Sequence, residues 1–382
     1  MARQPLAVFV MVLGFVCTFP AGVGLGAGVA DTPPSDEHCS SFTLGNNGQA
    51  VFACNYDRRI DDDGLVLINK RGIVKTSYQP GTTGRLAEWT ARYASITFSL
   101  LGYQFPWAGM NERGLSFSTM ALMETECPSP DERPLLESGF WLQYMLDNCE
   151  TVEEVIAIDA EVRIDTVDHY LVADRHGGVV VLEFLDGRMV ARTGPELCAA
   201  ALTNSTYEDS CHLWESLRPA GNYNQQNNSI HRFCLAADRV RDFQPGTTAH
   251  SVGYAFDTLH QVRGQLWGGN TRWSIVFDTR NLRAYFRTER NPEIRWVDLE
   301  AFDLRCGRAP QMLDINTGLT GDVTGASTDL DFEANRDLVE AYIVRWDIDY
   351  NPDDITALIG LFESYPCAQT RRSPGRRIAP TR

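Results

Sequence analysis

The sequence predicts an α+β domain in which antiparallel β-sheet is covered by helices. Three observations carry this prediction. Strand signals begin directly after residue 38 and resume at residue 169. Two helical stretches separate these blocks of strands, and further helices follow the second block. Tight-turn sequences such as Asn47-Gly48 join neighbouring strands, which is typical of hairpins and not of alternating strand–helix units.

The first block is a series of short apolar strands joined by polar turns. The turn "GNNGQ" joins expected strands at 39–44 and 50–56, and "KRG" joins strands at 64–69 and 73–77. The segment "PWAGMNER" separates strands at 94–100 and 114–122. This pattern predicts an antiparallel meander.

Helices and a second set of strands follow. Residues 135–148 carry apolar side chains at helical spacing, and Thr151 with Glu154 forms a capping box at the next helix. Residues 230–243 have the same helical spacing. The other expected elements are strands at 169–174, 178–184, 188–193, 200–204, 273–278 and 282–288, and helices at 332–346 and 353–365.

Size and charge limit the possible functions. The chain has 382 residues, enough for one large domain, and no linker interrupts it before about residue 307. We therefore expect a domain over residues 39–306 and a C-terminal helical extension over 307–382. The formal net charge of −16 disfavours contact with a phosphate backbone, so nucleic acid is not an expected partner.

The first thirty residues have the pattern of a signal peptide. Arg3 precedes an apolar run over residues 6–16, and Gly28 and Ala30 suit cleavage before Asp31. A membrane anchor is the alternative, but the run is short for a spanning helix, and no later stretch is apolar enough to span. We expect a signal peptide over 1–30, a short pro-segment over 31–38, and a protein exported to the periplasm or secreted.

Nine cysteines remain after the expected removal of Cys17 with the leader. An oxidising compartment permits disulfides, and the odd number leaves at least one thiol free or paired between chains. The sequence does not determine the pairing, although a bond between Cys306 and Cys367 would join the tail to the core. Zinc is a weak alternative because no two cysteines have Cys-x-x-Cys spacing, so no metal is expected.

Cys39 is the first candidate for chemistry, because removal of residues 31–38 would make it the N-terminal residue. Its α-amine, with a pKa of about 7.7–8.0, would then lie beside its thiol and serve as the base. The alternative is a cysteine of a structural disulfide.

Five motifs in order favour the first interpretation: residues 39–57, 64–72, 107–115, 201–208 and 230–239. With them the sequence resembles the choloylglycine hydrolase family, amidases with an N-terminal nucleophile that include bile salt hydrolases and penicillin V acylases. The likeness runs from Cys39 to about Leu304. It implies a four-layer αββα sandwich with two antiparallel sheets. It also implies hydrolysis of a linear amide through a thioester, without a cofactor. Members of this family often form tetramers, so a homotetramer is possible.

The resemblance also assigns roles by position. Cys39 is the nucleophile, Asp57 holds its amine, and Arg232 lies near it. The side-chain amide of Asn204 and the backbone N–H of Trp107 form the oxyanion hole. The alternatives are a turn aspartate for Asp57, a surface helix arginine for Arg232 and a strand-end asparagine for Asn204. For Trp107 the alternative is a core or pocket-lining aromatic residue.

The chain departs from the family pattern at Cys54, where many members carry arginine. The loss weakens stabilisation of the thiolate, and a Cys39–Cys54 disulfide would silence the enzyme until reduced. An inactive binding protein on the same fold is therefore the rival hypothesis, and acyl transfer to an amine is a third. Tyr103 and Met123 are expected in the pocket that selects among N-acyl amides such as penicillin V, conjugated bile salts and acyl homoserine lactones.

Overall fold

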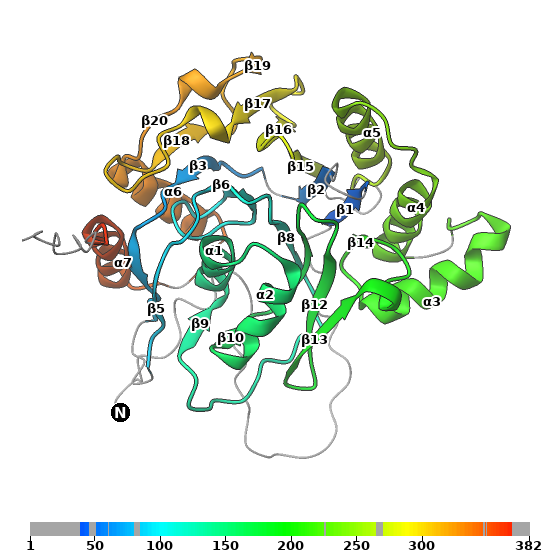
Figure 1. Ribbon diagram of the computed structural model, residues 1–382, viewed down its shortest axis with the longest axis horizontal. Coiled ribbons are helices and arrows are strands. Elements are labelled where there is room, and N and C mark those ends of the chain that lie inside the picture. The colour runs from blue at the N-terminus through cyan, green and yellow to red at the C-terminus, as the bar shows by residue number, and fades with distance from the viewer. Residues whose placement is uncertain are drawn as a thin grey trace, which may run out of the picture.

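Figure 1 shows the computed structural model, which describes residues 39–45, 51–59, 61–79, 85–224, 227–264, 270–346, 348 and 350–368. The expected signal peptide and pro-segment therefore lie outside the described residues. Among the helices in those ranges, none is both long enough and apolar enough to cross a membrane.

Two large sheets form the centre of the molecule. The seven-stranded sheet has the order β14 (Ala201–Leu202), β1 (Ser40–Leu44), β2 (Val51–Arg58), β15 (Asn270–Asp278), β16 (Arg283–Thr288), β17 (Arg295–Asp298), β19 (Gly321–Asp322). The nine-stranded sheet has the order β13 (Arg188–Thr193), β12 (Val179–Leu185), β11 (Asp168–Ala173), β8 (Ser116–Ala121), β7 (Ala108–Asn111), β6 (Ser95–Ser99), β3 (Leu65–Asn69), β18 (Gln311–Asp314), β20 (Thr328–Asp329). Neighbouring strands are antiparallel except for the short β17–β19 pair.

Two small ribbons lie beside these sheets. In one, β4 (Val74–Thr76) and β5 (Glu88–Thr90) are antiparallel, and in the other, β9 (Leu135–Glu137) and β10 (Arg163–Asp165) are parallel.

Helices cover the outer face of each large sheet (Figure 1). On the seven-stranded sheet, α4 (Asn228–Asp242) packs on β1, α5 (Thr248–Gln261) packs on β2 and β15, and α3 (Tyr207–Leu217) packs on α4. On the nine-stranded sheet, α1 (Ser138–Asn148) packs on β7 and is followed by α2 (Val152–Ala157). The predicted four-layer α+β sandwich is therefore confirmed.

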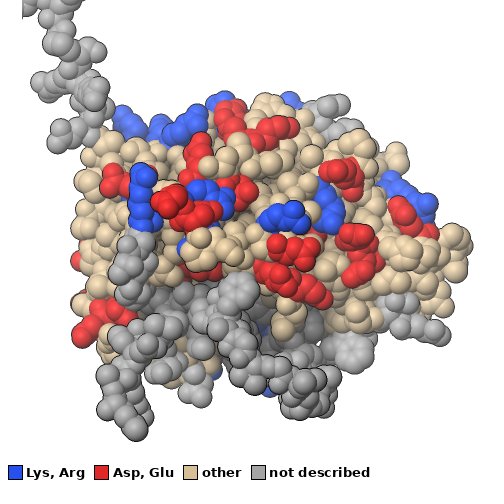
Figure 2. Space-filling view, turned by 90° about the horizontal axis from the view of Figure 1, so that it is seen from below, with Lys and Arg blue, Asp and Glu red and all other residues tan. Residues whose placement is uncertain are grey.

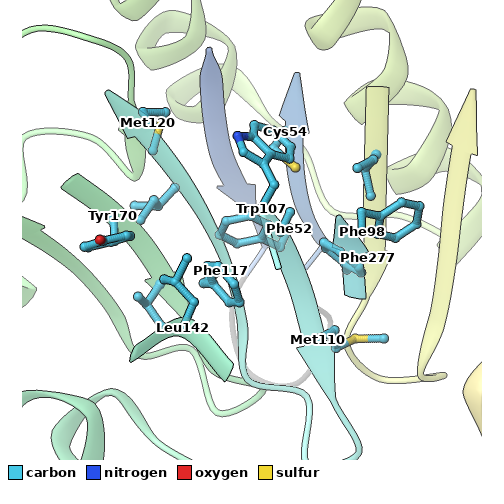
Figure 3. Close-up of a cluster of buried hydrophobic side chains, with 14 of the residues drawn as sticks. Phe52, Cys54, Phe98, Trp107, Met110, Phe117, Met120, Leu142, Tyr170 and Phe277 are labelled. Atoms are coloured by element: carbon cyan, nitrogen blue, oxygen red, sulfur yellow. The ribbon is translucent and has the colours of Figure 1, made fainter. Parts of the chain in front are cut away.

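Aromatic side chains fill the space between the two sheets (Figure 3). The ring of Phe98 in β6 lies 5.7 Å from the ring of Phe277 in β15 and 5.4 Å from that of Phe286 in β16, with edge-to-face geometry. Tyr56 in β2 meets Trp107 at 5.2 Å. Because such rings bury large apolar areas, these contacts join the sheets into one core.

The C-terminal segment packs on the sandwich through α6 (Phe332–Arg345) and α7 (Pro352–Ser364). The Phe362 ring lies 5.8 Å from both Tyr103 and Phe105. The expected disulfide between Cys306 and Cys367 is present. Residues beyond 306 also supply β18, β19 and β20, so the segment expected to be helical contributes strands to both sheets.

Two expected connections differ in the structure. Residues 64–69 and 73–77 do not form a hairpin, because β3 pairs with β6 and β18 while β4 pairs with β5. The expected link "PWAGMNER" contains β7, which pairs with both β6 and β8. Gly109 permits this strand, because a Cβ there would lie 2.8 Å from Leu146 of α1.

Candidate active site

Cys39 lies directly before β1 and is almost completely buried. The β1–β2 register sets Ser40 opposite Asn55 and Ser41 opposite Cys54. Ser41 faces the other sheet, because its Oγ donates to Met120 Sδ at 3.4 Å. Successive side chains alternate between the faces of a strand, so Cys39 shares the inter-sheet face with Ser41 and Cys54.

Arg232 of α4 joins the expected nucleophile to the expected oxyanion residue. Its Nη1 donates to the backbone oxygen of Cys39 and, at 2.6 Å, to Ser40 Oγ, while its Nη2 donates to Asn204 Oδ1 at 3.0 Å. Burial lowers the pKa of Arg232, and the negative charges of Asp57 and Cys39 raise it. The residue is buried, so the surface-arginine alternative does not apply, and its charge favours a thiolate at Cys39.

The amide of Asn204 is held in one orientation at the turn between β14 and α3. Its Oδ1 accepts from Arg232, which places Nδ2 on the opposite side, and Nδ2 donates to the backbone oxygen of Ala121 at 3.1 Å. Its backbone N–H donates to Ser229 Oγ at 2.9 Å. A primary amide has two N–H donors, so one donor remains for an oxyanion beyond these contacts.

Two buried side chains of the nine-stranded sheet brace this turn from behind. His169 Nε2 lies 2.5 Å from the backbone oxygen of Thr203, so it is the donor. Glu183 Oε1 accepts the backbone N–H of Tyr207 at 2.8 Å and lies 3.4 Å from His169 Nδ1. The brace therefore holds the residue before Asn204 and the first residue of α3.

Sequence reasoning missed this brace, although a signal was present. His169 and Glu183 are polar residues inside the apolar strand runs "HYLVAD" and "GVVVLEF". Burial raises the pKa of Glu183, but the interactions with His169, the Tyr207 N–H and Arg192 together hold that pKa below its usual value. A disulfide between Cys198 and Cys211 also closes the segment that carries Asn204.

Asp57 is fully buried near the end of β2, which excludes the turn-aspartate alternative. Its Oδ1 accepts from Thr271 Oγ1 at 2.5 Å, and the backbone N–H of Gly264 also bonds the carboxylate. Within the described residues its Oδ2 has no hydrogen-bond partner. Burial raises the pKa of Asp57 to about 7, although Arg232, Thr271 and Gly264 each lower it.

Trp107 does not supply the expected oxyanion donor. Its backbone N–H donates to the backbone oxygen of Phe98 at 2.8 Å, as part of the pairing between β6 and β7. Its side chain belongs to the inter-sheet cluster drawn in Figure 3. The core-aromatic alternative therefore describes Trp107 here, because the strand ladder already uses its N–H.

Cys54 lies in the same inter-sheet cluster (Figure 3). Both Cys39 and Cys54 stand outside the two disulfides, so the silencing disulfide is not formed in this structure. Burial, and secondarily the charge of neighbouring Cys39, raises the pKa of the Cys54 thiol. Arg58, two strand positions past Tyr56, stacks on the Trp346 ring at 4.6 Å.

The two expected pocket residues have different surroundings. Tyr103 is buried against Phe332 and Phe362, and its backbone N–H donates to Asn335 Oδ1 at 2.7 Å. This corrects the expectation that it lines an open pocket, because the C-terminal helices cover it. Met123 is 65% exposed and follows the strand whose last residue, Ala121, accepts the Asn204 amide.

Metal binding finds no support in the described part of the chain. Within those ranges, no group of three or more His, Cys, Asp or Glu side chains is arranged to hold an ion.

Comparisons with known proteins identify related sequences. A family model described as acyl-coenzyme A:6-aminopenicillanic acid acyl-transferase matches residues 45–292. A penicillin V acylase of Pectobacterium atrosepticum is 25% identical over 264 residues, which cover 56% of this chain and 68% of that protein.

Two solved structures have the same fold. Penicillin V acylase from Agrobacterium tumefaciens superimposes with a TM-score of 0.69 at 24% identity, covering 77% of this chain and 98% of that one. A mutant conjugated bile acid hydrolase from Clostridium perfringens gives 0.59 at 16% identity, covering 74% and 98%. The sandwich is therefore the fold of the N-terminal-nucleophile hydrolases.

Proposed function

We propose that the protein is an exported amidase with Cys39 as its N-terminal nucleophile. The chain belongs to the acyl-coenzyme A:6-aminopenicillanic acid acyl-transferase family, which groups with the penicillin acylases and choloylglycine hydrolases. Its substrate is a non-peptide N-acyl amide, of the kind represented by penicillin V, conjugated bile salts and acyl homoserine lactones. The observation that carries the proposal is the Arg232 guanidinium, which bonds both the Cys39 backbone and the Asn204 amide.

Maturation at Cys39 would fill the one vacancy in the hydrogen bonding of Asp57. Removal of residues 31–38 would convert the Cys39 backbone nitrogen into an α-ammonium group. Asp57 Oδ2 has no partner among the described residues, and burial makes its negative charge costly. An ammonium group beside it would lower that cost and hold the amine in place.

The reaction then proceeds in two halves. The Cys39 sulfur adds to the amide carbonyl while the α-amine takes the thiol proton. The Asn204 amide donates to the oxyanion, and the α-ammonium gives its proton to the leaving amine as the C–N bond breaks. Water, deprotonated by the α-amine, hydrolyses the thioester and regenerates the thiol. One well-aimed oxyanion donor contributes about 3 kcal/mol in related chemistry.

Export is supported by the leader-like start and by the two disulfides among the described residues, Cys198–Cys211 and Cys306–Cys367. Disulfides persist in oxidising compartments such as the periplasm or the extracellular space. Cell fractionation, with a mature N-terminus at Cys39 and not at Asp31, tests export and maturation together.

Activity is tested with the mature protein on penicillin V, glycine- and taurine-conjugated bile acids and acyl homoserine lactones. Cys39→Ala should abolish turnover of whichever amide is cleaved. Cys149→Ala is the matched control, because Cys149 is also buried and outside the disulfides but lies at the end of α1. A mature chain that still starts at Asp31, with Cys39 in a disulfide, would contradict the proposal and favour an inactive binding protein.

Acyl transfer is the second candidate, because the matching family model is described as an acyl-transferase. In that reaction an amine and not water attacks the thioester. Mass spectrometry of products formed with an added amine acceptor separates the two, since transfer yields a new amide and hydrolysis yields the free acid.

A further inference from the structure

A cavity of about 410 Å³ lies on the helix-covered side of the seven-stranded sheet. It is formed by the end of α5, the start of β15 and the end of β16. Arg263, Arg272, Arg287 and His260 line it, together with the single carboxylate Glu289. Its volume is within the range of small-molecule sites, and this lining is cationic although the whole chain carries a net charge of −16.

The Glu289 carboxylate is already occupied. One of its oxygens forms an ion pair with Arg272 Nη1, and the other accepts from Asn270 Nδ2 at 2.9 Å. Arg272 in turn donates through Nε to the backbone oxygen of Arg58 at 3.0 Å and through Nη2 to that of Arg59. These groups satisfy one another and form a fixed wall of the cavity.

Arg263 and Arg287 have no such carboxylate contact among the described residues. Arg263 Nη1 donates to His260 Nε2 and to the His260 backbone oxygen, both at 2.7 Å, and its buried Nε has no hydrogen-bond partner there. Arg287 donates to the Phe256 backbone oxygen at 3.5 Å, and Asp257 attracts it without an ion pair. Two partly buried guanidinium groups therefore line the cavity, and each has N–H donors beyond the hydrogen bonds named here.

His260 strengthens this arrangement. Its Nε2 accepts from Arg263, so the proton of the neutral ring is on Nδ1. Burial, then Arg263 and Arg287, lowers the pKa of His260, so the ring is neutral at neutral pH and its Nε2 can accept the hydrogen bond from Arg263.

We propose that this cavity is a binding site for a small oxyanion, a carboxylate or phosphate group, held by Arg263 and Arg287. A guanidinium group binds such oxygens with paired, charge-assisted hydrogen bonds. The bound anion would act as the counter-ion of these two half-buried guanidinium groups, neither of which pairs with a carboxylate among the described residues. Thr271, which also lines the cavity, donates to Asp57, so one hydrogen bond links the cavity wall to the residue expected to hold the α-amine.

The test measures thermal unfolding of the purified protein in inorganic phosphate against sodium chloride of equal ionic strength. Phosphate at about ten times its Kd should raise Tm by about 2 °C for a chain of this size. Arg263→Gln with Arg287→Gln should remove the shift, measured from the variant's own phosphate-free Tm. Arg188→Gln is the matched control, because Arg188 is exposed on β13 of the other sheet, and it should keep the shift.

If phosphate does not raise the Tm of the wild-type protein above its Tm in sodium chloride, the proposal is overturned, whether or not the variants fold. An undiminished shift in the double variant overturns it too. Kinetics then identify the source of the anion: if phosphate raises KM without changing kcat, the cavity takes the acid group of the substrate. If KM stays constant while phosphate binds, the site serves a separate anion.

Discussion

The raised pKa of Asp57 makes a quantitative prediction about stability. The carboxylate is fully buried, and burial raises its pKa from 3.8 to about 7 against the opposing effects of Arg232, Thr271 and Gly264. At about 1.4 kcal/mol for each pH unit, ionising Asp57 in the folded protein costs about 4 kcal/mol more than in the unfolded chain. Asp57→Asn removes that cost, because the amide keeps an oxygen for Thr271 and carries no charge.

The direction with pH follows from proton binding. Below about pH 4, Asp57 is protonated in both the folded and unfolded states, so it contributes no difference. Between pH 4 and 7 the unfolded chain releases the proton and the folded protein retains it, so Asp57 opposes folding more and more as pH rises. Above pH 7 the full cost applies. The Tm of Asp57→Asn should therefore exceed that of the parent by nearly zero at pH 4 and by about 5 °C at pH 8, given a typical unfolding entropy of about 2 cal/mol/K per residue.

The assay is differential scanning calorimetry across this pH range in a Cys39→Ala background. That background is chosen so that no α-amine forms beside Asp57 by self-cleavage. Asp337→Asn is the control, because Asp337 is exposed on α6 and should leave the Tm difference flat. A Tm gap between Asp57→Asn and its parent that does not change with pH would refute the assignment of a buried, proton-retaining carboxyl group.

Three further variants test the rest of the site and the packing around it. Asn204→Ala should lower kcat about 100-fold or more with little change in KM, since the amide acts on the oxyanion; an equal rise in KM would instead indicate a role in substrate binding. His169→Ala should lower kcat about tenfold by releasing the Thr203 backbone oxygen, and His169→Gln, which keeps an N–H donor, should recover part of that loss; equal effects of the two variants would argue against a bracing hydrogen bond. Phe362→Ala should lower the free energy of unfolding by about 3–5 kcal/mol in a denaturant titration, because the ring is buried against Tyr103 and Phe105; a loss below 1 kcal/mol would mean that α7 is loosely packed.

The strands could be predicted where local chemistry determines them. Strand signals on either side of the Asn47-Gly48 turn predicted β1 and β2, and their pairing brings Cys39 and Asp57 into one hairpin. Asn204 and Arg232 came only from the order of the family motifs. No local sequence pattern predicts the hydrogen bond between Arg232 and Asn204, which are 28 residues apart. That contact depends on the tertiary packing of α4 against the turn after β14.

The misplaced oxyanion donor has a specific cause. Residues 106–113 were interpreted as a connection because they contain proline, glycine and charged residues, yet Ala108–Asn111 forms a strand. Once β7 lies between β6 and β8, the N–H of Trp107 belongs to the sheet ladder. The strand is short, and its pairing partners rather than its own propensity determine it.

Helices α3 and α5 were missed for a related reason. Their sequences are rich in polar residues, although side chains such as Trp214 in α3 and Phe256 in α5 are buried. Their helical structure is supported by caps from Thr206 and Thr247, whose side chains accept the N–H groups of the first turn.

Cys54 occupies the position where the family pattern has arginine, so the positive charge near the expected nucleophile comes from Arg232 instead. The Cys54 thiol is buried between the sheets, and its raised pKa keeps it neutral, so no charge stands at the position where arginine is expected. Arg232 reaches Cys39 through the backbone oxygen and the Ser40 hydroxyl, from the helix-covered side of the sheet. Arg232 and Cys39 also interact electrostatically, since the charge of Cys39 raises the pKa of Arg232. Under the proposed mechanism the α-amine takes the thiol proton, and Asp57 Oδ2, which has no partner among the described residues, is where the amine would bind.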